Sequence, residues 1–550
     1  MTFHARDWFP VPDDTARVAR KVYRKGNPYM TIRDKLGLWY QDSRYAQLFT
    51  STRGHIALSP AILNMVLIIQ FIEGLTDRQV AEEVRGRIDL KYLLGMRLED
   101  PGFEFTVLSE HRARLLAGGL VRQLFIDMLD HFQAYDLLKA RGKQRTDSTH
   151  VLASVRSLNR LERVGETIRA VLNLLAEVAP EWLRQQIEPD WGALYGPRFE
   201  QSRLPKKESE REQLAREIGA DGYRLLLAIW SDTAPSYLRQ LEIVETMRRL
   251  WIQQYYLEGD KVNWRSDEDS PPPGERIQSP YDPEARNRTK RDVNWTGYTV
   301  HLTETCDDEG PNLIVDVQTT DASVVDSEMT PLIHQSLADK DLLPSEHYLD
   351  TGYVEAKHIL TARDEYGIDL VGPVMPDTSR QAREGLGFAH SCFFINWEAK
   401  QARCPEDQSS YRWQERKTNA GKDVIYIYFP PPKCHTCERR RECTDAEVGG
   451  RSLVILAQPE YSVLQEMRQR QETEEFKERY KRRAGVEGTI SQGTRSFELR
   501  QARYIGLEKT HLQHVLTALA MNVARVAVYL EGEAKAKTRQ SRFQLLVSAA

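Results

Sequence analysis

The spacing of apolar residues predicts a helical first segment. In residues 1–130, Ser59-Pro60 begins an apolar helix that Gly74 ends, and Thr76 caps a second, amphipathic helix. A third helix is expected over TVLSEHRARLL, which brings Arg112 and Arg114 close together. We expect this segment to bind DNA, and short helices joined by a tight glycine turn are compatible with a helix-turn-helix unit. A small helical bundle with a solvated charged face is the alternative.

The spacing then changes from helical to alternating. KQRTDSTHVLAS predicts a strand with Asp147 near its start, and helical spacing returns over residues 155–260. A stretch rich in Pro, Ser and acidic residues, 265–285, predicts an exposed connection, and the basic run ARNRTKRD follows it.

Beyond residue 290 the pattern predicts a mixed sheet. GYTVHLTETCD and NLIVDVQTT alternate as two strands joined by a polar turn, and DSEMTPLIHQSLADKDL has helical spacing. EHYLD, VEAKHILTARDEYG and IDLVGPV predict strand, helix and strand, and residues 461–530 predict long helices. We therefore expect an α/β fold with a mixed sheet. The predicted segments are a helical N-terminal domain (1–135), a first core strand (136–154), a mainly helical insertion with its linker (155–290), the continued core (291–375), a cysteine-bearing insertion (376–460) and C-terminal helices that complete the core (461–550).

Composition narrows the class of protein. The chain has 550 residues, a formal charge of −4 and six cysteines, so several domains are expected and no global charge indicates nucleic acid. No apolar stretch is long enough to span a membrane, and the N-terminus lacks a signal-peptide core. We expect a cytoplasmic protein without a membrane partner, and DNA contacts through local basic patches.

Two aspartates lie at predicted strand ends, where α/β sheets gather functional groups. Asp147 is at the start of one strand, and Asp350 is at the end of another, directly before Thr351-Gly352. Carboxylates from separate elements can hold two Mg²⁺ ions for phosphodiester chemistry. The alternative is that each aspartate only caps a turn or a helix.

A third carboxylate is offered by Glu487. On a helix, Phe476, Tyr480, Arg483 and Glu487 share one face. Residues 477–503 contain eight Lys or Arg and three Glu, which suits a site that meets both a metal ion and a phosphate backbone. A solvated, salt-bridged helix is the alternative.

Several motifs together resemble those of bacterial insertion-sequence transposases with an RNase H-like DDE domain. They are DSTHVLASVRSLNRLERVGET, SPYDPEARNRTKRDVNWTGYTVHLTETCD, LDTGYV, YKRRAGVEGTISQ and, near the start, GLTDRQVAEEVRGRIDLKYLLG. The resemblance covers nearly the whole chain. It implies an RNase H-like catalytic core in which Asp147, Asp350 and Glu487 are the catalytic, metal-binding carboxylates.

The same resemblance implies roles for nearby residues. Related transposases carry a Tyr, Arg, Glu, Lys signature, and here Tyr480, Arg483 and Glu487 fit it. The lysine position holds Thr494, with Arg495 beside it. Tyr480, Arg483 and Arg495 are thereby expected to contact DNA, as are Arg112 and Arg114 of the N-terminal helices. Asp316, His150 and His301 are expected to be structural or to support the site.

Four cysteines fall within one predicted insertion. Cys434, Cys437 and Cys443 form CHTCERRREC, and Cys404 lies upstream in ARCPED. A C-x₂-C pair with two further cysteines resembles a structural zinc site, for which His435 is an alternative ligand. Reduced, buried cysteines are the other interpretation.

The expected activity is transposition. The protein would bind the terminal inverted repeats of its element, cleave a strand with two Mg²⁺ (or Mn²⁺) ions, and join the freed end to target DNA. Its partner is double-stranded DNA at the nucleoid, and pairing two ends implies a homodimer in the active complex. A domesticated DNA-binding protein and an RNase H-like nuclease without strand transfer are the alternatives.

Overall fold

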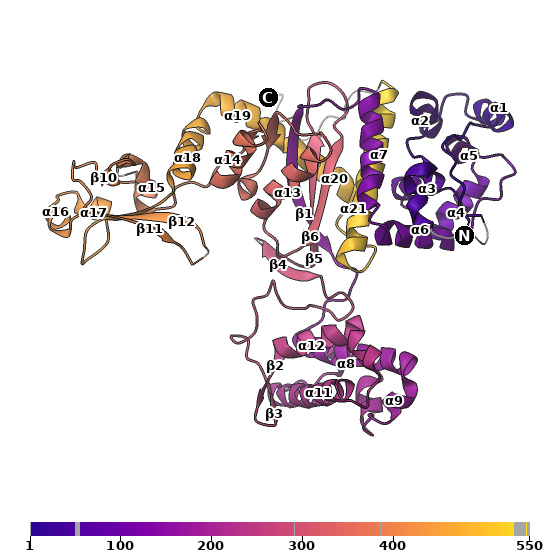
Figure 1. Cartoon of the computed structure of the whole chain (residues 1–550), viewed down its shortest axis with the longest axis horizontal. Coiled ribbons are helices and arrows are strands. Elements are labelled where there is room, and N and C mark those ends of the chain that lie inside the picture. The colour runs from indigo at the N-terminus through magenta and orange to yellow at the C-terminus, as the bar shows by residue number, and fades with distance from the viewer. Residues whose placement is uncertain are drawn as a thin grey trace.

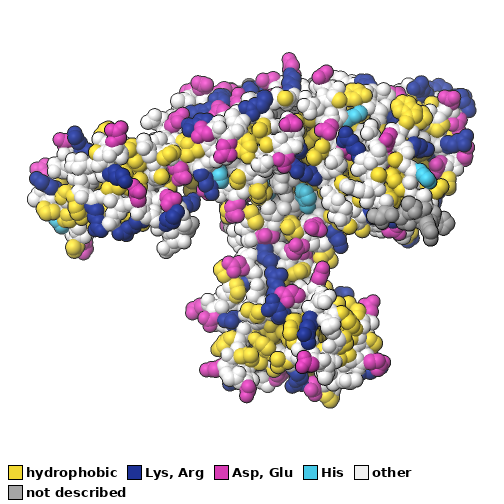
Figure 2. All heavy atoms as spheres, in the orientation of Figure 1, with side chains coloured by type: hydrophobic (Ala, Val, Ile, Leu, Met, Phe, Trp, Pro, Cys, Tyr) yellow, Lys and Arg dark blue, Asp and Glu magenta, His cyan; other side chains and the backbone are white. Residues whose placement is uncertain are grey.

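The computed structural model describes residues 2–49, 56–290, 292–385, 387–419, 421–532 and 546. A central sheet is flanked by the N-terminal helices on one side and by a lobe of residues 376–456 on the other (Figure 1). A helical lobe projects below the sheet. In Figure 2, charged side chains of both signs are scattered over the visible face of every lobe. Any cationic surface on this face is therefore confined to local clusters of Lys and Arg.

The N-terminal helices follow the predicted caps. Ser59 accepts a hydrogen bond from the Ile62 amide, Gly74 ends the first predicted helix in the left-handed conformation, and Thr76 forms a capping box with Gln79. The two helices meet at 108°. The elements of this region are α1 (Asp13–Val22), α2 (Pro28–Leu36), η1 (Asp42–Leu48), α3 (Pro60–Glu73), α4 (Asp77–Gly86), α5 (Ile88–Leu94), α6 (Thr106–Ala117) and α7 (Val121–Ala134).

No single helix of the described residues is long and apolar enough to cross a membrane. The bent pair of α3 and α4 passes the length and composition test together, but α3 is almost entirely buried in the protein's own core.

The central sheet is mixed, and the α/β prediction is confirmed. Its strands run in the order β6–β5–β1–β7–β8, with β4 pairing the first part of β5 on the same side as β6. β5 is antiparallel to β1, β4 and β6, whereas β7 and β8 are parallel to β1. This arrangement is compatible with an RNase H-like core. The strands are β1 (Lys143–Leu152), β4 (Arg286–Lys290), β5 (Val293–Thr305), β6 (Ile314–Asp321), β7 (Glu346–Tyr348) and β8 (Asp369–Val371).

Helices cover the sheet and link it to the N-terminal region. Leu67 of α3, Val300 of β5 and Leu516 of the last helix belong to one apolar core, so the N-terminal helices share their main core with the sheet. The elements are α13 (Asp326–Ala338), η4 (Thr351–Tyr353), α14 (Ala356–Asp364), α18 (Gln458–Arg470), α19 (Glu474–Tyr480), η6 (Lys481–Ala484), α20 (Gly485–Ser496) and α21 (Leu507–Leu530).

The lower lobe has an apolar core of its own, which runs from Leu161 to Ile277. Its helical content agrees with the periodicity of residues 155–260, and a short hairpin closes it. The elements are α8 (Arg160–Val178), α9 (Pro180–Arg184), α10 (Trp191–Tyr195), η2 (Gln201–Arg203), α11 (Glu208–Ile229), η3 (Ser236–Gln240), α12 (Glu242–Gln254), β2 (Tyr255–Glu258) and β3 (Lys261–Trp264).

The lobe that contains the four cysteines also has a separate apolar core, built on a three-stranded antiparallel sheet. The elements are α15 (Arg380–Glu384), η5 (His390–Cys392), β9 (Phe394–Asn396), β10 (Gln401–Arg403), β11 (Arg412–Lys417), β12 (Asp423–Tyr428), α16 (Pro431–His435), α17 (Arg440–Cys443) and β13 (Ser452–Leu456).

One sequence prediction about the sheet is wrong. Asp147 was expected at the start of a strand, but β1 begins at Lys143 and Asp147 lies at its middle. The polar residues before Asp147 are part of the strand, and Arg145 among them is buried against Glu304, which lies 159 residues away in the sequence. Asp350 follows β7 by two residues, close to the predicted strand end.

Candidate active site

The sheet register brings the two aspartates to the same level. Arg145 of β1 pairs with Tyr348 of the parallel strand β7, and Asp147 and Asp350 each lie two residues further along. Residues two apart on a strand point to the same face. Glu487 lies in the first turn of α20, which packs on β1. All three carboxylates line one cleft of about 680 Å³.

The guanidinium of Arg483 lies among the three carboxylates. Its Nη2 is 2.6 Å from Asp147 Oδ2 and 4.0 Å from Asp350 Oδ2, and its Nη1 is 2.8 Å from Glu487 Oε1. We call these four residues the carboxylate cluster. Arg483 and Asp147 are 14% and 18% exposed, whereas Asp350 and Glu487 are 51% and 67% exposed. The cluster has a formal charge of −2 and opens to solvent on the side of Asp350 and Glu487.

The positive charge of Arg483 offsets only in part the rise in the pKa of Asp147 that burial causes. Burial raises the pKa of Asp147, and the neighbouring Asp350 and Asp326 raise it further. The charge of Arg483 and the Ser148 amide lower it, but the net pKa stays above the usual value. A second positive charge placed near Asp147 would therefore be favourable.

Asp350 also acts as a cap. Its carboxylate accepts a hydrogen bond from the Thr351 amide at 2.7 Å and starts η4. The capping role and a place in the cleft are compatible, because the other carboxylate oxygen faces Arg483. The two interpretations of this aspartate thus describe different oxygens of the same side chain.

A buried ion cluster holds α20 on the sheet. Glu304 is fully buried and accepts from Arg145 Nε at 2.7 Å, from Arg525 Nη1 at 2.8 Å and from the Thr489 hydroxyl at 2.5 Å. We call Arg145, Glu304, Thr489 and Arg525 the buried cluster. Burial raises the pKa of Glu304, but Arg525, Arg145 and Thr489 outweigh it, so that the net pKa is lowered. A Cβ atom at Gly485 would meet the guanidinium of Arg145, which explains the glycine there.

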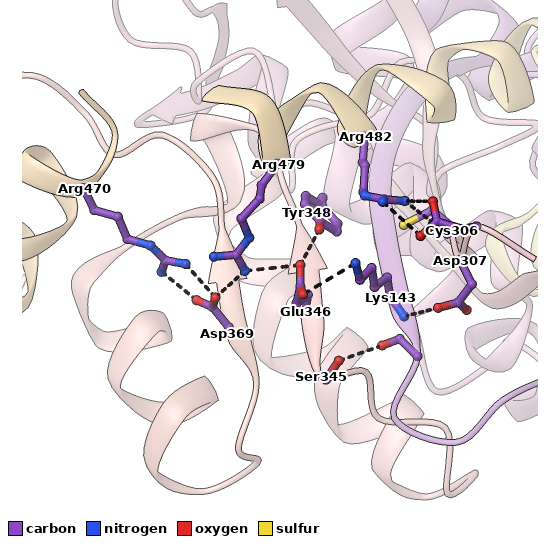
Figure 3. Close-up of polar contacts among 12 residues, drawn as sticks. Lys143, Cys306, Asp307, Ser345, Glu346, Tyr348, Asp369, Arg470, Arg479 and Arg482 are labelled. Carbon is purple, nitrogen blue, oxygen red and sulfur yellow. Dashed lines mark hydrogen bonds and ion pairs between the residues drawn. The ribbon is translucent and has the colours of Figure 1, made fainter. Parts of the chain in front are cut away.

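The helix that leads to Glu487 is also fixed at the start of the parallel strands (Figure 3). Glu346 and Asp369 pair in register at the starts of β7 and β8. Arg479 of α19 binds Asp369 at 2.7 Å and Glu346 at 3.2 Å, and Arg470 grips Asp369 with two hydrogen bonds of 2.6 Å. These contacts set the direction of the helical segment, so that Glu487 falls beside Asp147.

Two protein-family models match parts of the chain. A family model described as Transposase DDE domain matches residues 403–527, and a Transposase domain (DUF772) matches residues 17–114. Together the two matches support an insertion-sequence DDE transposase. No curated protein and no solved structure matches. The first match contains Glu487 but neither aspartate, and the second spans the N-terminal helices through Arg114.

Cations line the transposase cleft beside the carboxylates. The cleft walls include Arg288, Lys290, Arg495 and Arg500. Lys290 lies 3.0 Å from Asp326, whose other oxygen accepts from Ser148. The sequence showed the basic run that contains Arg288 and Lys290, but it gave no sign that β4 would place them here. Arg495, which was expected to contact DNA, lies in the cleft wall.

The other predicted DNA contacts differ in environment. Tyr480 stacks on Phe476 at 5.9 Å, and burial raises the pKa of its hydroxyl to about 12. Arg112 is 8% exposed and grips Asp77 at 2.8 and 2.5 Å, so this geometry does not support a DNA contact. Arg114 is partly exposed and binds Glu110 at 3.2 Å.

Three residues that we expected to be structural have internal partners. The ring of His150 lies 5.5 Å from that of Trp295. His301 Nδ1 is 2.7 Å from the Tyr353 hydroxyl, and Asp316 is paired with Lys340.

The four cysteines lie near one another: Cys443 belongs to the apolar core of their lobe, and Cys404 and Cys434 pack against that core. Burial raises the pKa of Cys443 to about 11, and the thiols of Cys434, Cys404 and Cys437 add to this rise. Backbone amides donate to Cys404 Sγ at 3.3 Å and to Cys434 Sγ at 3.5 Å. Across the described part of the chain, however, no group of three or more His, Cys, Asp or Glu side chains is arranged to hold a metal ion. The predicted zinc site is therefore not supported.

Proposed function

We propose that the transposase binds the ends of its element, cleaves a DNA strand and transfers that strand to target DNA, with Asp147, Asp350 and Glu487 as its metal-binding carboxylates. One observation carries the proposal. Three carboxylates from separate elements meet around one guanidinium, in a cleft whose walls carry further cations. The strand order is compatible with an RNase H-like core.

The donor set fits a hard divalent cation. Carboxylate oxygens are the ligands that Mg²⁺ and Mn²⁺ prefer, and the formal charge of −2 favours binding of cations. In this structure the oxygens are arranged around Arg483 rather than in a form that could hold a metal ion. Asp147, Asp350 and Glu487 would hold the two ions, which would activate the attacking oxygen and stabilise the leaving one.

The protein's own residues supply positioning. Arg483 fixes the side chains of Asp147 and Glu487 relative to each other, because its planar fork reaches both. Arg288, Arg495 and Arg500 offer guanidinium groups to DNA phosphates along the cleft. In-line attack tolerates little misalignment, so a rigid carboxylate frame is an advantage.

End binding should involve the whole chain. Because the N-terminal helices share their main core with the sheet, residues 1–130 do not form a unit to be tested alone. Binding of the full chain to the DNA that flanks its gene should weaken steeply with salt, because phosphate contacts release counterions. Two ends held together imply a homodimer in the active complex.

The test exchanges each carboxylate for its amide. Asp147→Asn, Asp350→Asn and Glu487→Gln should each slow Mg²⁺-dependent cleavage of end DNA by about a thousandfold, or roughly 4 kcal/mol in the barrier, while end binding is kept. Glu478→Gln is the control, because Glu478 is 73% exposed on the preceding helix. Wild-type cleavage by Asp350→Asn would refute the site. If the wild-type protein cleaves end DNA but gives no joined products, the alternative of an RNase H-like nuclease is favoured. If it binds end DNA without cleaving it, the alternative of a domesticated DNA-binding protein is favoured.

A further inference from the structure

The three-stranded sheet of the cysteine-containing lobe has two different faces. Alternate residues of β12 and β13, such as Ile427 and Leu453, point into the apolar core of the lobe. The opposite face is not covered by that core. At one end of this opposite face Val424 is buried and Leu456 packs on the main core. We call the rest the free face, and its residues are Arg412, Gln414, Arg416, Tyr426, Tyr428, Ser452 and Val454.

The free face pairs arginines with tyrosines. Arg412 lies opposite Tyr428 in the strand register, and its guanidinium is 5.6 Å from the centre of that ring. The guanidinium of Arg416 is 5.3 Å from the ring of Tyr426. The two tyrosine rings lie 6.4 Å apart and are inclined by only 18°. Arg416, two tyrosines and Arg412 therefore follow one another along the sheet.

This face lacks negative charge, unlike the rest of the hairpin. Lys400 and Lys417 pair with Glu415 and Asp423 at 2.9 Å each. The guanidinium of Arg416 instead donates to the Gln414 side chain at 2.6 Å. Within the described part of the chain, neither Arg412 nor Arg416 forms an ion pair with a carboxylate. The two exposed arginines thus keep their charge available to an anionic partner.

We propose that the free face binds a DNA strand whose bases are unpaired. Tyrosine rings and guanidinium planes stack on the flat faces of bases, and arginines bind the phosphates between them. Paired bases in a duplex present only their edges to the grooves, so a flat sheet cannot stack on them. The order of Arg416, Tyr426, Tyr428 and Arg412 offers two ring surfaces between two phosphate-binding groups.

The position of the hairpin links this face to the cleft. Lys422, in the turn between β11 and β12, binds Glu355 at 3.2 Å. Glu355 immediately precedes α14 and lies five residues after Asp350. The turn of the hairpin therefore rests against the segment that leaves the cleft, and Figure 1 shows the lobe extending outward from α14 and α18. The inference rests on the proposed function, because it takes DNA as the partner.

The test measures binding of the full chain to a fluorescent oligothymidylate and, separately, to duplex DNA from the flanks of its gene. Tyr426→Leu combined with Tyr428→Leu keeps apolar bulk and removes the rings. It should weaken oligothymidylate binding by about tenfold or more, because each stacked base contributes substantially. Duplex end binding and cleavage should remain. Lys400→Ala combined with Lys417→Ala is the control and should bind as the wild type does.

A second measurement keeps the test decisive if the leucine variant does not fold. Oligonucleotides that contain 5-iododeoxyuridine should crosslink on irradiation to peptides that include residues 426 and 428 of the wild-type chain. Crosslinks confined to other peptides would overturn the inference. So would a wild-type chain that binds duplex ends but no oligothymidylate, or a folded leucine variant with unchanged binding. A wild-type chain that neither binds nor cleaves duplex end DNA would instead refute the proposed function.

Discussion

Two clusters that each include one residue of α20 combine arginine with carboxylate side chains, and they are built in opposite ways. In the buried cluster, two arginines and a hydroxyl satisfy one glutamate that has no exposure. In the carboxylate cluster, one arginine serves three carboxylates, two of which are largely exposed. Satisfied ions inside a protein hold structure, whereas an excess of open carboxylates is suited to binding cations. The net charge of a cluster and its exposure to solvent thus distinguish a structural cluster from one suited to binding cations.

The largest expected effect comes from breaking the buried cluster. Glu304→Gln should destabilise the protein by about 3–5 kcal/mol, because it leaves Arg145 and Arg525 buried without their counter-charge. Denaturant unfolding of the metal-free protein measures this. Asp147→Asn, which removes a carboxylate from the carboxylate cluster, should cost far less. Equal losses of stability in the two variants would remove the distinction between the clusters.

A smaller effect is expected at the glycine that makes room for Arg145. Gly485→Ala places a Cβ atom against a guanidinium that is fixed by Glu304, and overpacking of this kind costs about 1–3 kcal/mol. Gly488 lies one turn away, and a Cβ atom there would have nothing within 4 Å. Gly488→Ala should therefore stabilise the helix by up to about 1 kcal/mol. If Gly485→Ala and Gly488→Ala change the free energy of unfolding in the same direction, the contact between position 485 and Arg145 is contradicted.

Within the carboxylate cluster, the shape of the arginine should matter as well as its charge. Arg483→Lys keeps the charge but cannot bridge Asp147 and Glu487 with a planar fork. We expect strand cleavage to slow by about tenfold or more, roughly 1.4 kcal/mol in the barrier, with end binding changed much less. Arg482→Lys is the matched control, because its partner Asp308 is 75% exposed. A silent Arg483→Lys exchange would indicate that Arg483 only balances charge.

The same two clusters show what sequence patterns can predict. The strands over residues 293–321, the helix α13 and the caps of α3 and α4 follow from local periodicity and local capping, and the structure has them. The position of Asp147 within β1 was predicted wrongly, because the polar residues before it enter the sheet through distant partners, such as that of Arg145, 159 residues away. Such pairs depend on how the chain folds back on itself, which no local pattern reports.

The candidate site was predicted unevenly for the same reason. The motifs suggested Asp147, Asp350 and Glu487, and the fold brings these residues together. Arg483 was expected to reach a phosphate, yet its nearest partners are the carboxylates themselves, one of them 336 residues away. The tyrosine-arginine face of the cysteine-containing lobe was not predicted, because it is formed by the register of two strands.

The smallest expected effect is on the pH dependence of stability, where the clusters should differ in sign. The pKa of Asp147 is raised above 3.8 in the folded protein, so the folded state binds this proton more tightly than the unfolded state does. Its contribution to stability is present below the unfolded pKa and is lost as pH rises through the folded pKa. The pKa of Glu304 is lowered below 4.5, so its contribution is present above that value and is lost as pH falls through the folded pKa.

Unfolding free energies of chelator-treated protein between about pH 4 and pH 7 test this difference, a range that begins near the ordinary carboxyl pKa values. The stability of Asp147→Asn relative to the wild type should increase as pH rises, because the variant lacks the group that loses its contribution. The exposed exchange Glu478→Gln is the control for general effects of removing a carboxylate. If the stability of Asp147→Asn relative to the wild type decreases as pH rises, the charge of Arg483 fully compensates the burial of the Asp147 carboxylate. The carboxylate cluster would then be a satisfied ion network like the buried one, and its excess negative charge could not be the reason for it to bind cations.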